Sequence, residues 1–395
     1  MSAVPSPRPS WSAQVVVVGG GIGGLTAAVA LRQAGREVVV LERAPSLEPV
    51  GAAISLAPNA LRALDVLGVG DEVRALAARV GEGGMRSPSG RWLARTDAAG
   101  IAARFGDPLL LLPRSTLVDV LTARLPEGAV RTGCRAAVTD PGGAGRPARV
   151  TTPAGELTAG LVAAADGIHS PARGVLFPAH PGVVYSGFTT WRVMVPAPAA
   201  EIVSHETWGP GRLWGTHRLT DGRIYAYAAA TTPPGGRAAD DEKAELLRLF
   251  GDWHEPVPSV LAAIRPQDVL RHDVHHVAPS LPAHHRGRVA LVGDAAHAMP
   301  PTLGQGGNQA IEDAVVLAHH AEDLPAYTAA RLPRTSALVT RSVRTSRLAM
   351  TRNRPAAALR DTAVAALSRT GPALFLRALD GIADWHPPQH TPGAA

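Results

Sequence analysis

The sequence predicts an α/β fold, in which a parallel-sheet domain is interrupted by an inserted, mostly antiparallel sheet and followed by C-terminal helices. Three observations support this prediction: a strand–helix–strand pattern over Gln14–Glu42, alternating aromatic-rich strands over Val183–Ala230, and helical patterns after Ala310. Strands linked by helices usually pair in parallel, whereas strands with alternating apolar residues usually form antiparallel sheets. A chain of 395 residues is long enough for two such domains.

The composition is that of a folded globular protein, with 46% hydrophobic and 18% charged residues. The net charge is +6, but the arginines are scattered along the chain, so no nucleic-acid-binding patch is predicted. Cys134 is the only cysteine, which excludes an intrachain disulfide and a thiolate metal cluster. Met1–Ala13 lacks the apolar core of a signal peptide, and no run reaches about 18 apolar residues, so we expect a cytoplasmic protein without a membrane span.

The strongest local pattern is a complete βαβ unit near the N-terminus. A strand is predicted over Val15–Val18, a helix over Leu25–Ala34 and a second strand over Glu37–Leu41. Between the first strand and the helix, Gly19–Gly24 has the pattern G-x-G-x-x-G. Glu42 follows the second strand at about the 20-residue spacing of an acid that binds an adenosine ribose. This combination predicts dinucleotide binding.

Each glycine of this turn has a distinct expected role. Gly19 permits the tight turn, Gly21 lets a pyrophosphate approach the backbone, and Gly24 allows close packing of helix and strand. Arg43, directly after Glu42, is either a solvated surface charge or a group that lies over the adenine.

A second strand–loop–helix pattern occurs far along the chain. A buried strand is predicted over Arg288–Val292, followed by Gly293-Asp294, a loop rich in Pro and Gly, and a helix that begins near Gly306. Asp294 can accept hydrogen bonds from sugar-type hydroxyls. The free N–H groups of the following helix can stabilise negative charge.

Three shorter segments also carry candidate ligand-binding residues. Ala53 lies in a small-residue loop where a flat ring can approach the backbone closely. Arg114 stands before Ser115, a predicted helix N-cap, and we favour an anchoring role for it over a solvated charge. A buried strand over 160–166 ends at Asp166-Gly167, again an acid at a strand end. Val130–Val138 is predicted as one continuous strand in which Cys134 packs.

His272, His275 and His276 lie on a predicted half-exposed strand over Val269–Val277. They lack acidic or thiol partners at metal-ligand spacing apart from Asp273, so no metal site is predicted.

In combination, these motifs resemble those of group A flavoprotein monooxygenases with the p-hydroxybenzoate hydroxylase fold. The matching residues are Gly19–Gly24 with Glu42, Asp166-Gly167, and Gly293-Asp294 followed by Pro300-Pro301 and Gly304-Gln305-Gly306. The segments Pro49–Ser55 and Glu206–Gly209 are most similar to those of urate-hydroxylase-like and salicylate-hydroxylase-like members. The resemblance implies a Rossmann-like FAD-binding domain, an inserted mostly antiparallel substrate domain and C-terminal helices.

The resemblance also implies residue roles. The residues expected to bind FAD are Gly19, Gly21, Ile22, Gly23, Gly24, Glu42, Arg43, Ala53, Arg114, Asp166, Asp294, Gly304, Gln305, Gly306 and Gly307. Asp166 belongs to a family motif linked to both FAD and NAD(P)H. The residue before the family arginine is usually His or Ser and here is Pro113, which is a departure from the family pattern at the local contact of Arg114. The implied domain boundaries are 14–82, 105–182 and 281–325 for FAD binding, 83–104 and 183–280 for the substrate sheet, and 326–388 for the C-terminal helices.

The expected catalytic and substrate residues are Arg192, His217, Tyr225 and Pro300. Arg192 either holds an anionic group or points outward, and Pro300 borders the position of oxygen chemistry. His217 and Tyr225 either hydrogen-bond or deprotonate a phenol or indole, or only pack. In urate-hydroxylase-like members an Arg addresses the substrate where this chain has Leu213, which favours a less anionic compound than urate.

The resemblance implies a single-component monooxygenase that uses FAD, NADPH or NADH, and O2. It would hydroxylate or epoxidise an electron-rich aromatic or polyketide-like molecule through a flavin C4a-hydroperoxide. The alternatives are a non-oxygenating reductase or halogenase-like flavoprotein, and a flavin-binding protein that sequesters a ligand. The expected partner is an aromatic or polycyclic small molecule, without nucleic acid or membrane, and the expected state is a monomer or homodimer.

Overall fold

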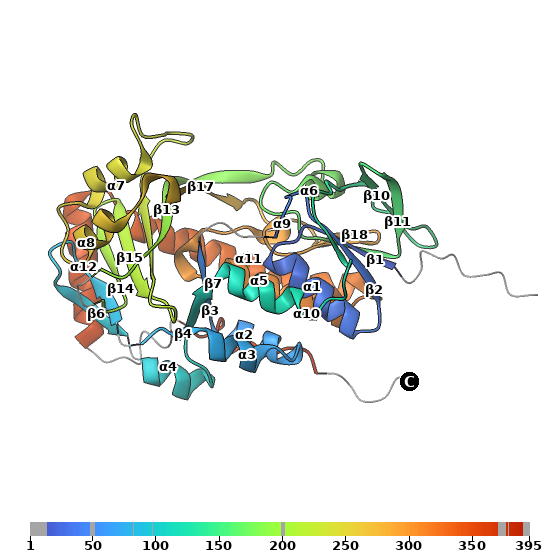
Figure 1. Ribbon diagram of the computed structural model, residues 1–395, viewed down its shortest axis with the longest axis horizontal. Helices are drawn as coiled ribbons and strands as arrows, with labels where there is room; N and C mark the ends of the chain where they lie inside the picture. Colours follow the sequence, from blue (N-terminus) through green and yellow to red (C-terminus); the bar gives the residue numbers. More distant parts are fainter. Residues whose placement is uncertain are drawn as a thin grey trace, which may run out of the picture.

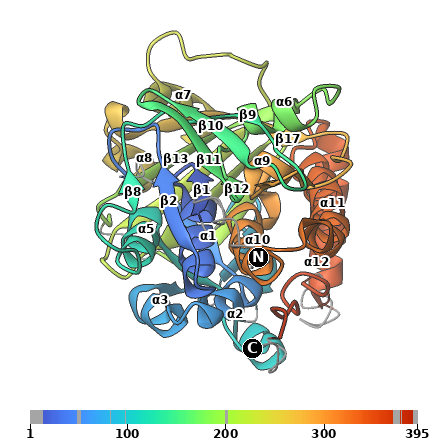
Figure 2. The same cartoon turned by 90° about the vertical axis from the view of Figure 1, so that its right-hand side faces the viewer.

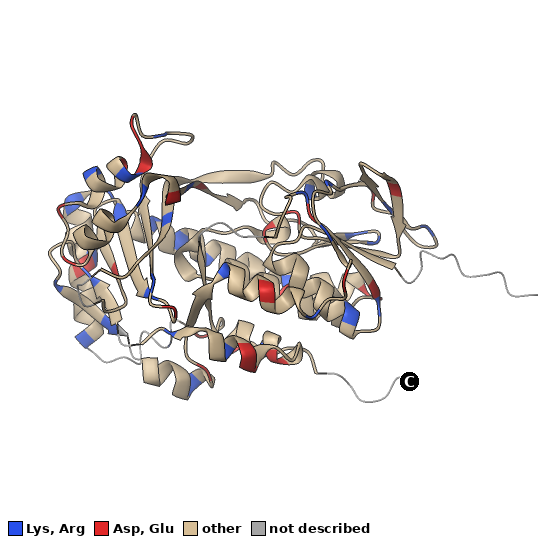
Figure 3. Ribbon diagram, viewed as in Figure 1, with Lys and Arg blue, Asp and Glu red and all other residues tan. Residues whose placement is uncertain are grey.

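The computed structural model describes residues 14–47, 52–81, 83–96, 98–198, 202–369, 377 and 379–389. Residues 49–51 of the small-residue loop before Ala53 lie outside this part of the chain. Figure 1 shows two parts side by side, a parallel sheet with its helices and an antiparallel sheet with α7, α8 and α12. Positive and negative residues occur in both parts (Figure 3). No helix of the described residues is long and apolar enough to cross a membrane.

The first part is built on a six-stranded sheet. Its strand order is β18 (His285–Arg286), β19 (Val289–Leu291), β12 (Leu161–Ala164), β1 (Gln14–Val18), β2 (Glu37–Leu41) and β8 (Val130–Arg131). Every neighbouring pair is parallel except β18 with β19. The central strands are runs of Val, Ala and Leu because both faces of the sheet are covered.

Two layers cover the faces of this sheet. Val15 and Val17 pack on helices α1 (Ile22–Gln33) and α10 (Gly306–His319). Val16 and Val18 point the other way, toward a three-stranded sheet of β9 (Ala137–Asp140), β10 (Ala148–Thr152) and β11 (Gly155–Ala159). Figure 2 shows the small sheet on one side of β1 and β2 and the two helices on the other. Alternate residues of one strand therefore fill two separate cores.

The second part is a seven-stranded sheet. Its order is β17 (Leu270–Val277), β13 (Val183–Val195), β16 (Ile224–Ala230), β15 (Arg212–Arg218), β14 (His205–Gly209), β5 (Gly83–Arg86) and β6 (Trp92–Thr96). Only β14 and β5 pair in parallel. Trp191, Val193 and Trp214 pack under helices α7 (Glu242–Phe250) and α8 (Val257–Ala263). The alternate residues of these strands therefore face the first part.

The remaining elements connect and cover the two sheets. A three-stranded sheet has the order β3 (Ala53–Leu56), β7 (Leu110–Pro113) and β4 (Ala78–Arg79). The other described helices are α2 (Pro58–Val66), α3 (Gly70–Leu76), α4 (Ala98–Phe105), α5 (Arg114–Thr122), α6 (Pro171–Leu176), α9 (Asp294–His297), α11 (Leu324–Ala349) and α12 (Arg354–Arg369), with short 3-10 turns at Pro266–Asp268 and Pro301–Leu303.

Two predictions about local structure were wrong. The segment predicted as one strand over Val130–Val138 forms β8 and β9, because Gly133 turns the chain with a positive φ of 64°. Ser115 is not an N-cap: α5 already begins at Arg114, and the cap residue Pro113 makes no side-chain hydrogen bond. The N–H of Arg114 instead donates to the Ala52 carbonyl over 2.9 Å, which continues the pairing of β3 with β7.

Candidate active site

The glycine turn after β1 is sterically demanding at two positions and open at a third. Gly19 has a φ of +105°, and a Cβ there would overlap the Ala165 carbonyl oxygen. A Cβ on Gly24 would overlap the carbonyl oxygen of Gly19. Gly21, in contrast, is exposed, and a Cβ there would meet no atom of the described residues within 4 Å. Gly21 also starts α1 without a side-chain cap, so the helix presents free N–H groups to this open space.

Glu42 closes the same turn from the end of β2. Its two carboxylate oxygens accept the N–H groups of Gly20, over 2.6 Å, and Ala44, over 2.7 Å. Each oxygen keeps a further lone pair, so the carboxylate can still accept a ribose hydroxyl. Arg43 is exposed beside it.

Asp294 is an exposed residue within a buried segment. The described residues from 289 to 300 are all buried except Asp294, and its carboxylate makes no hydrogen bond or ion pair with another residue that the structure describes. A Cβ on Gly306 would lie 3.8 Å from its Oδ1, so the carboxylate stands beside the first turn of α10. Gln305, the cap residue of α10, also makes no side-chain cap bond. An unpartnered acid and a set of free N–H groups therefore share one surface.

The loop before α10 is held against β3. Asn308 donates to the carbonyl oxygens of Gly304, over 2.6 Å, and Ser55, over 2.9 Å, and accepts the Ala57 N–H over 2.8 Å. A Cβ on Gly307 would lie 2.7 Å from Ile54 Cδ1. Gly304 to Gly307 are thereby brought next to the strand that contains Ala53.

Arg114 lies within electrostatic range of residues from both parts of the molecule. Its guanidinium group is half-buried and makes no hydrogen bond or ion pair with a described residue. Burial lowers the pKa of Arg114, and the charge of Arg192 lowers it further, while Asp294 and Tyr225 raise it. These four residues lie on α5, β13, the first position of α9 and β16. The structure therefore brings the predicted flavin-side and substrate-side groups within electrostatic range of one another.

The facing side of the seven-stranded sheet carries the predicted substrate residues. Tyr225 packs with Leu111, and Ala53 and Met194 join the same cluster, so cofactor-side strands and the sheet are in contact. Burial raises the pKa of Tyr225, against the opposing charges of Arg192 and Arg114. Burial lowers the pKa of His217 to about 4, and its Nδ1 has no hydrogen-bond partner among the described residues.

Asp166 and Pro300 border the same region. Asp166 accepts the Ala172 N–H over 2.9 Å, and burial raises the pKa of its carboxyl group. Arg173, to which the sequence analysis assigned no role, donates to the carbonyl oxygens of Ile168, over 2.7 Å, and Ala295, over 3.1 Å. It thereby ties the loop after Asp166 to the segment after Asp294. Pro300 is buried at the start of the 3-10 turn.

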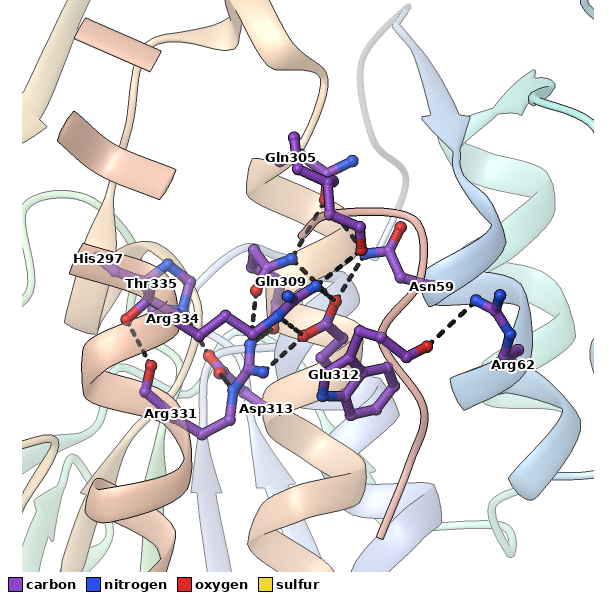
Figure 4. Close-up of polar contacts among 12 residues, drawn as sticks. Asn59, Arg62, His297, Gln305, Gln309, Glu312, Asp313, Arg331, Arg334 and Thr335 are labelled. Carbon is purple, nitrogen blue, oxygen red and sulfur yellow. Dashed lines mark hydrogen bonds and ion pairs between the residues drawn. The ribbon is translucent and has the colours of Figure 1, made fainter. Parts of the chain in front are cut away.

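Sequence reasoning missed a buried polar network beneath this surface (Figure 4). Asp313 Oδ2 accepts the Gly293 N–H over 2.8 Å and lies 2.6 Å from His297 Nε2, while Asp313 Oδ1 accepts Arg331 Nε over 2.6 Å. Arg331 also contacts Glu312 over 2.5 Å. The sequence did contain a signal for this network. Glu312 and Asp313 are adjacent acids on a predicted helix with few other charges, and Arg331 and Arg334 lie three positions apart in the next helix.

These residues fit FAD on three independent observations. Among the residues that the structure describes, Gly21 faces open space beside an uncapped helix, and neither the Asp294 carboxylate nor the Arg114 guanidinium group has a hydrogen-bond or ion-pair partner. Phosphates, ribityl hydroxyls and a polar ring edge are the groups that such a set can bind.

The fold and this set of residues define a flavin-dependent monooxygenase of the p-hydroxybenzoate hydroxylase type. A family model described as "FAD binding domain" matches residues 12–342, and the chain belongs to this family. It is therefore an FAD-dependent oxidoreductase, as the sequence predicted.

The relatives share most of the chain. An aurachin C monooxygenase/isomerase from Stigmatella aurantiaca is 36% identical, over 86% of this chain and 90% of the relative. An FAD-dependent urate hydroxylase from Klebsiella pneumoniae is 33% identical, over 77% of this chain and 80% of the relative. The crystal structure of Klebsiella pneumoniae HpxO complexed with FAD and uric acid is similar at a TM-score of 0.82 and 28% identity, covering 94% of this chain and 96% of that one.

Proposed function

We propose that this protein is a single-component monooxygenase that uses NADH or NADPH and O2 to hydroxylate or epoxidise an electron-rich aromatic or polycyclic small molecule. The observation that carries the proposal is the convergence of Arg114, Asp294, Arg192 and Tyr225. Arg114 and Asp294 belong to the proposed flavin side, and Arg192 and Tyr225 to the face of the sheet opposite it. A substrate held between them would lie against both sets of groups.

The proposed cofactor contacts follow from chemistry and position. Gly19–Gly24 and the free N–H groups of α1 would hold the pyrophosphate, and Glu42 would accept a ribose hydroxyl. Asp294 would accept hydroxyls of the ribityl chain, while Gly304–Gly307 would border the ring. When bound, FAD supplies the redox chemistry that takes electrons from NAD(P)H and activates O2.

The protein's own contribution is position, charge and exclusion of water. The N–H groups at the start of α10 favour negative charge next to them. Leu111, Met194 and Tyr225 form an apolar surface that limits the access of water to the reacting groups. Arg192 would orient an electron-rich oxygen or nitrogen of the substrate by hydrogen bonding.

The experiment is aerobic turnover of the FAD-loaded protein with NADH or NADPH, isotopically labelled O2, and a panel of phenols, indoles and aromatic polyketides. The proposal predicts a product that gains one labelled oxygen atom. If NAD(P)H is oxidised but no compound yields a labelled product, the result would instead favour a reductase. A halogenated product formed with added halide would favour a halogenase-like enzyme. Ligand binding without NAD(P)H oxidation would favour a ligand-sequestering protein. A cytoplasmic location, a monomeric or homodimeric state and the domain boundaries remain predictions from the sequence.

A further inference from the structure

Two polar residues on the substrate-facing side of the sheet, Tyr227 and Glu206, have no role in the function proposed above. In sheet register, Arg192 of β13 lies opposite Tyr227 of β16, Tyr227 opposite Gly215 of β15, and Gly215 opposite Glu206 of β14. These four residues therefore form one row across the sheet. Tyr227 contacts the ring of Tyr225 at a centroid distance of 5.7 Å, and it belongs to the cluster that includes Leu111 and Met194. The row thus adjoins the proposed reaction site.

The hydroxyl proton of Tyr227 is already used within this row. The Tyr227 hydroxyl donates to Glu206 Oε1, and the indole N–H of Trp208 donates to Glu206 Oε2 over 2.8 Å. A phenolic hydroxyl has one proton, so toward any further group Tyr227 acts as a hydrogen-bond acceptor. Its acceptor strength is increased by the carboxylate behind it.

The backbone of the sheet fixes the position of the Tyr227 ring. A Cβ on Gly215 would overlap the tyrosine ring, so the ring lies flat over this glycine. On its other side, the His217 ring is nearly parallel to it, with an interplanar angle of 17° and a centroid distance of 5.7 Å. The Tyr227 ring is therefore held in one orientation between the backbone of Gly215, where no side chain is in the way, and the stacked ring of His217.

Glu206 is the unusual member of the row. Both of its partners are neutral donors, and it forms no ion pair with any residue that the structure describes. Its surroundings include Trp208, Met85 and Tyr227, which share an apolar cluster. A carboxylate in such a place is costly when it lacks a cation. This cost is accounted for if the carboxylate has a task in ligand recognition.

We propose that Glu206 and Tyr227 form a specificity-determining pair, which selects aromatic substrates that present an O–H or N–H donor to the Tyr227 oxygen. This inference rests on the proposed function, because it places the substrate between this face and the flavin side. The Tyr227 oxygen has two lone pairs, and His217 Nε2 lies 3.5 Å from it. A substrate without a donor leaves the second lone pair of this oxygen unpaired, and an anionic substituent at this position is repelled by Glu206.

The test compares two probes of nearly the same shape, indole, which has an N–H donor, and benzothiophene, which has none. Their dissociation constants are measured by equilibrium dialysis against the FAD-loaded protein. The unaltered protein should bind indole about tenfold more tightly, as expected for one additional hydrogen bond. Glu206→Gln and Tyr227→Phe should each reduce this preference to about onefold to threefold.

The chain offers a matched control on the opposite face of the same sheet. There, Trp191 donates to Glu242 over 2.7 Å, which reproduces the Trp208–Glu206 contact away from the proposed site. Glu242→Gln should keep the tenfold preference. Circular dichroism and flavin content would establish that each variant is folded.

The proposal is overturned if the unaltered protein shows no preference for indole, or if folded Glu206→Gln and Tyr227→Phe both retain it. Failure of the proposed function would be seen separately, as absence of labelled oxygen in all products of the turnover experiment. If the protein oxygenates a compound but both variants retain the preference for indole, the proposed function stands and only the role of the Glu206–Tyr227 pair is contradicted.

Discussion

Arg331 Nε donates to Asp313 Oδ1 over 2.6 Å, and both side chains are fully buried. Arg331 comes from α11, whereas Asp313 lies on α10 and also accepts the Gly293 N–H next to Asp294. The charges of His297 and Arg331 lower the pKa of the Asp313 carboxyl group against the opposing effect of burial. Helix α11 is thereby connected, through the Asp313 carboxylate, to the start of α9, where the proposed ribityl-binding residue Asp294 lies.

Replacing Arg331 should destabilise the protein strongly. Arg331→Met removes a buried cation and leaves the carboxylates of Glu312 and Asp313 short of a partner, at an expected cost of about 3–5 kcal/mol in the free energy of unfolding. Urea denaturation of the FAD-free protein measures this change. The control is Arg104→Met, which breaks a half-exposed ion pair with Asp380 and should cost about 0–1 kcal/mol. Equal stabilities of the two variants would contradict a structural role for the network.

Two glycine substitutions should separate folding from cofactor binding. Gly24→Ala places a methyl group against the Gly19 carbonyl oxygen and should lower the stability of the FAD-free protein. Gly21→Ala meets no protein atom within 4 Å, so it should leave that stability unchanged but occupy the space proposed for the pyrophosphate. The measurements are thermal unfolding without FAD and titration with FAD by flavin fluorescence. Normal FAD affinity in Gly21→Ala would show that the pyrophosphate is bound elsewhere.

Stability should fall in mild acid because burial lowers the pKa of several histidines, His217 among them and most clearly His205 and His284. Burial lowers the pKa of His205 to about 4 and that of His284 to about 3. Both values lie below the ordinary histidine pKa of about 6.5, so between these limits the unfolded chain binds more protons and stability decreases as pH falls. Each histidine contributes a slope of up to about 1.4 kcal/mol per pH unit.

The corresponding measurement is the free energy of unfolding of the FAD-free protein between about pH 7.5 and about pH 4.5, a range that includes the ordinary histidine pKa. His284→Gln should remove about one histidine's share of the slope, whatever its effect on stability at neutral pH. An unchanged slope in this variant would mean that His284 is not kept neutral by burial.

The elements that the sequence predicted well are those with a strong local pattern. The strand over Glu37–Leu41 was predicted with its observed bounds, and the helix predicted to begin near Gly306 begins at Gly306. Runs of β-branched residues between turn residues restrict the chain locally, so little depends on distant contacts. The family and the cofactor followed from glycine and acid motifs of the same local kind.

The features that were missed depend on contacts between distant segments. The strand break after β8 arises because the N–H groups of Gly133 and Cys134 donate to the carbonyl oxygens of Ala44 and Glu42, which follow β2. The helix start at Arg114 is set by its hydrogen bond to Ala52, the residue directly before β3. The Tyr227–Glu206 contact likewise requires the register of three strands, which no local pattern specifies.

Asp294→Ala tests the central assignment most directly, because the Asp294 carboxylate has no partner among the described residues and its loss should not disturb folding. The measurement is the dissociation constant of FAD, with thermal unfolding of the FAD-free protein as the control. We expect about tenfold or weaker FAD binding, the loss of one charge-assisted hydrogen bond or more, at an unchanged unfolding temperature. A variant that purifies with full FAD occupancy and full monooxygenase activity would contradict the account.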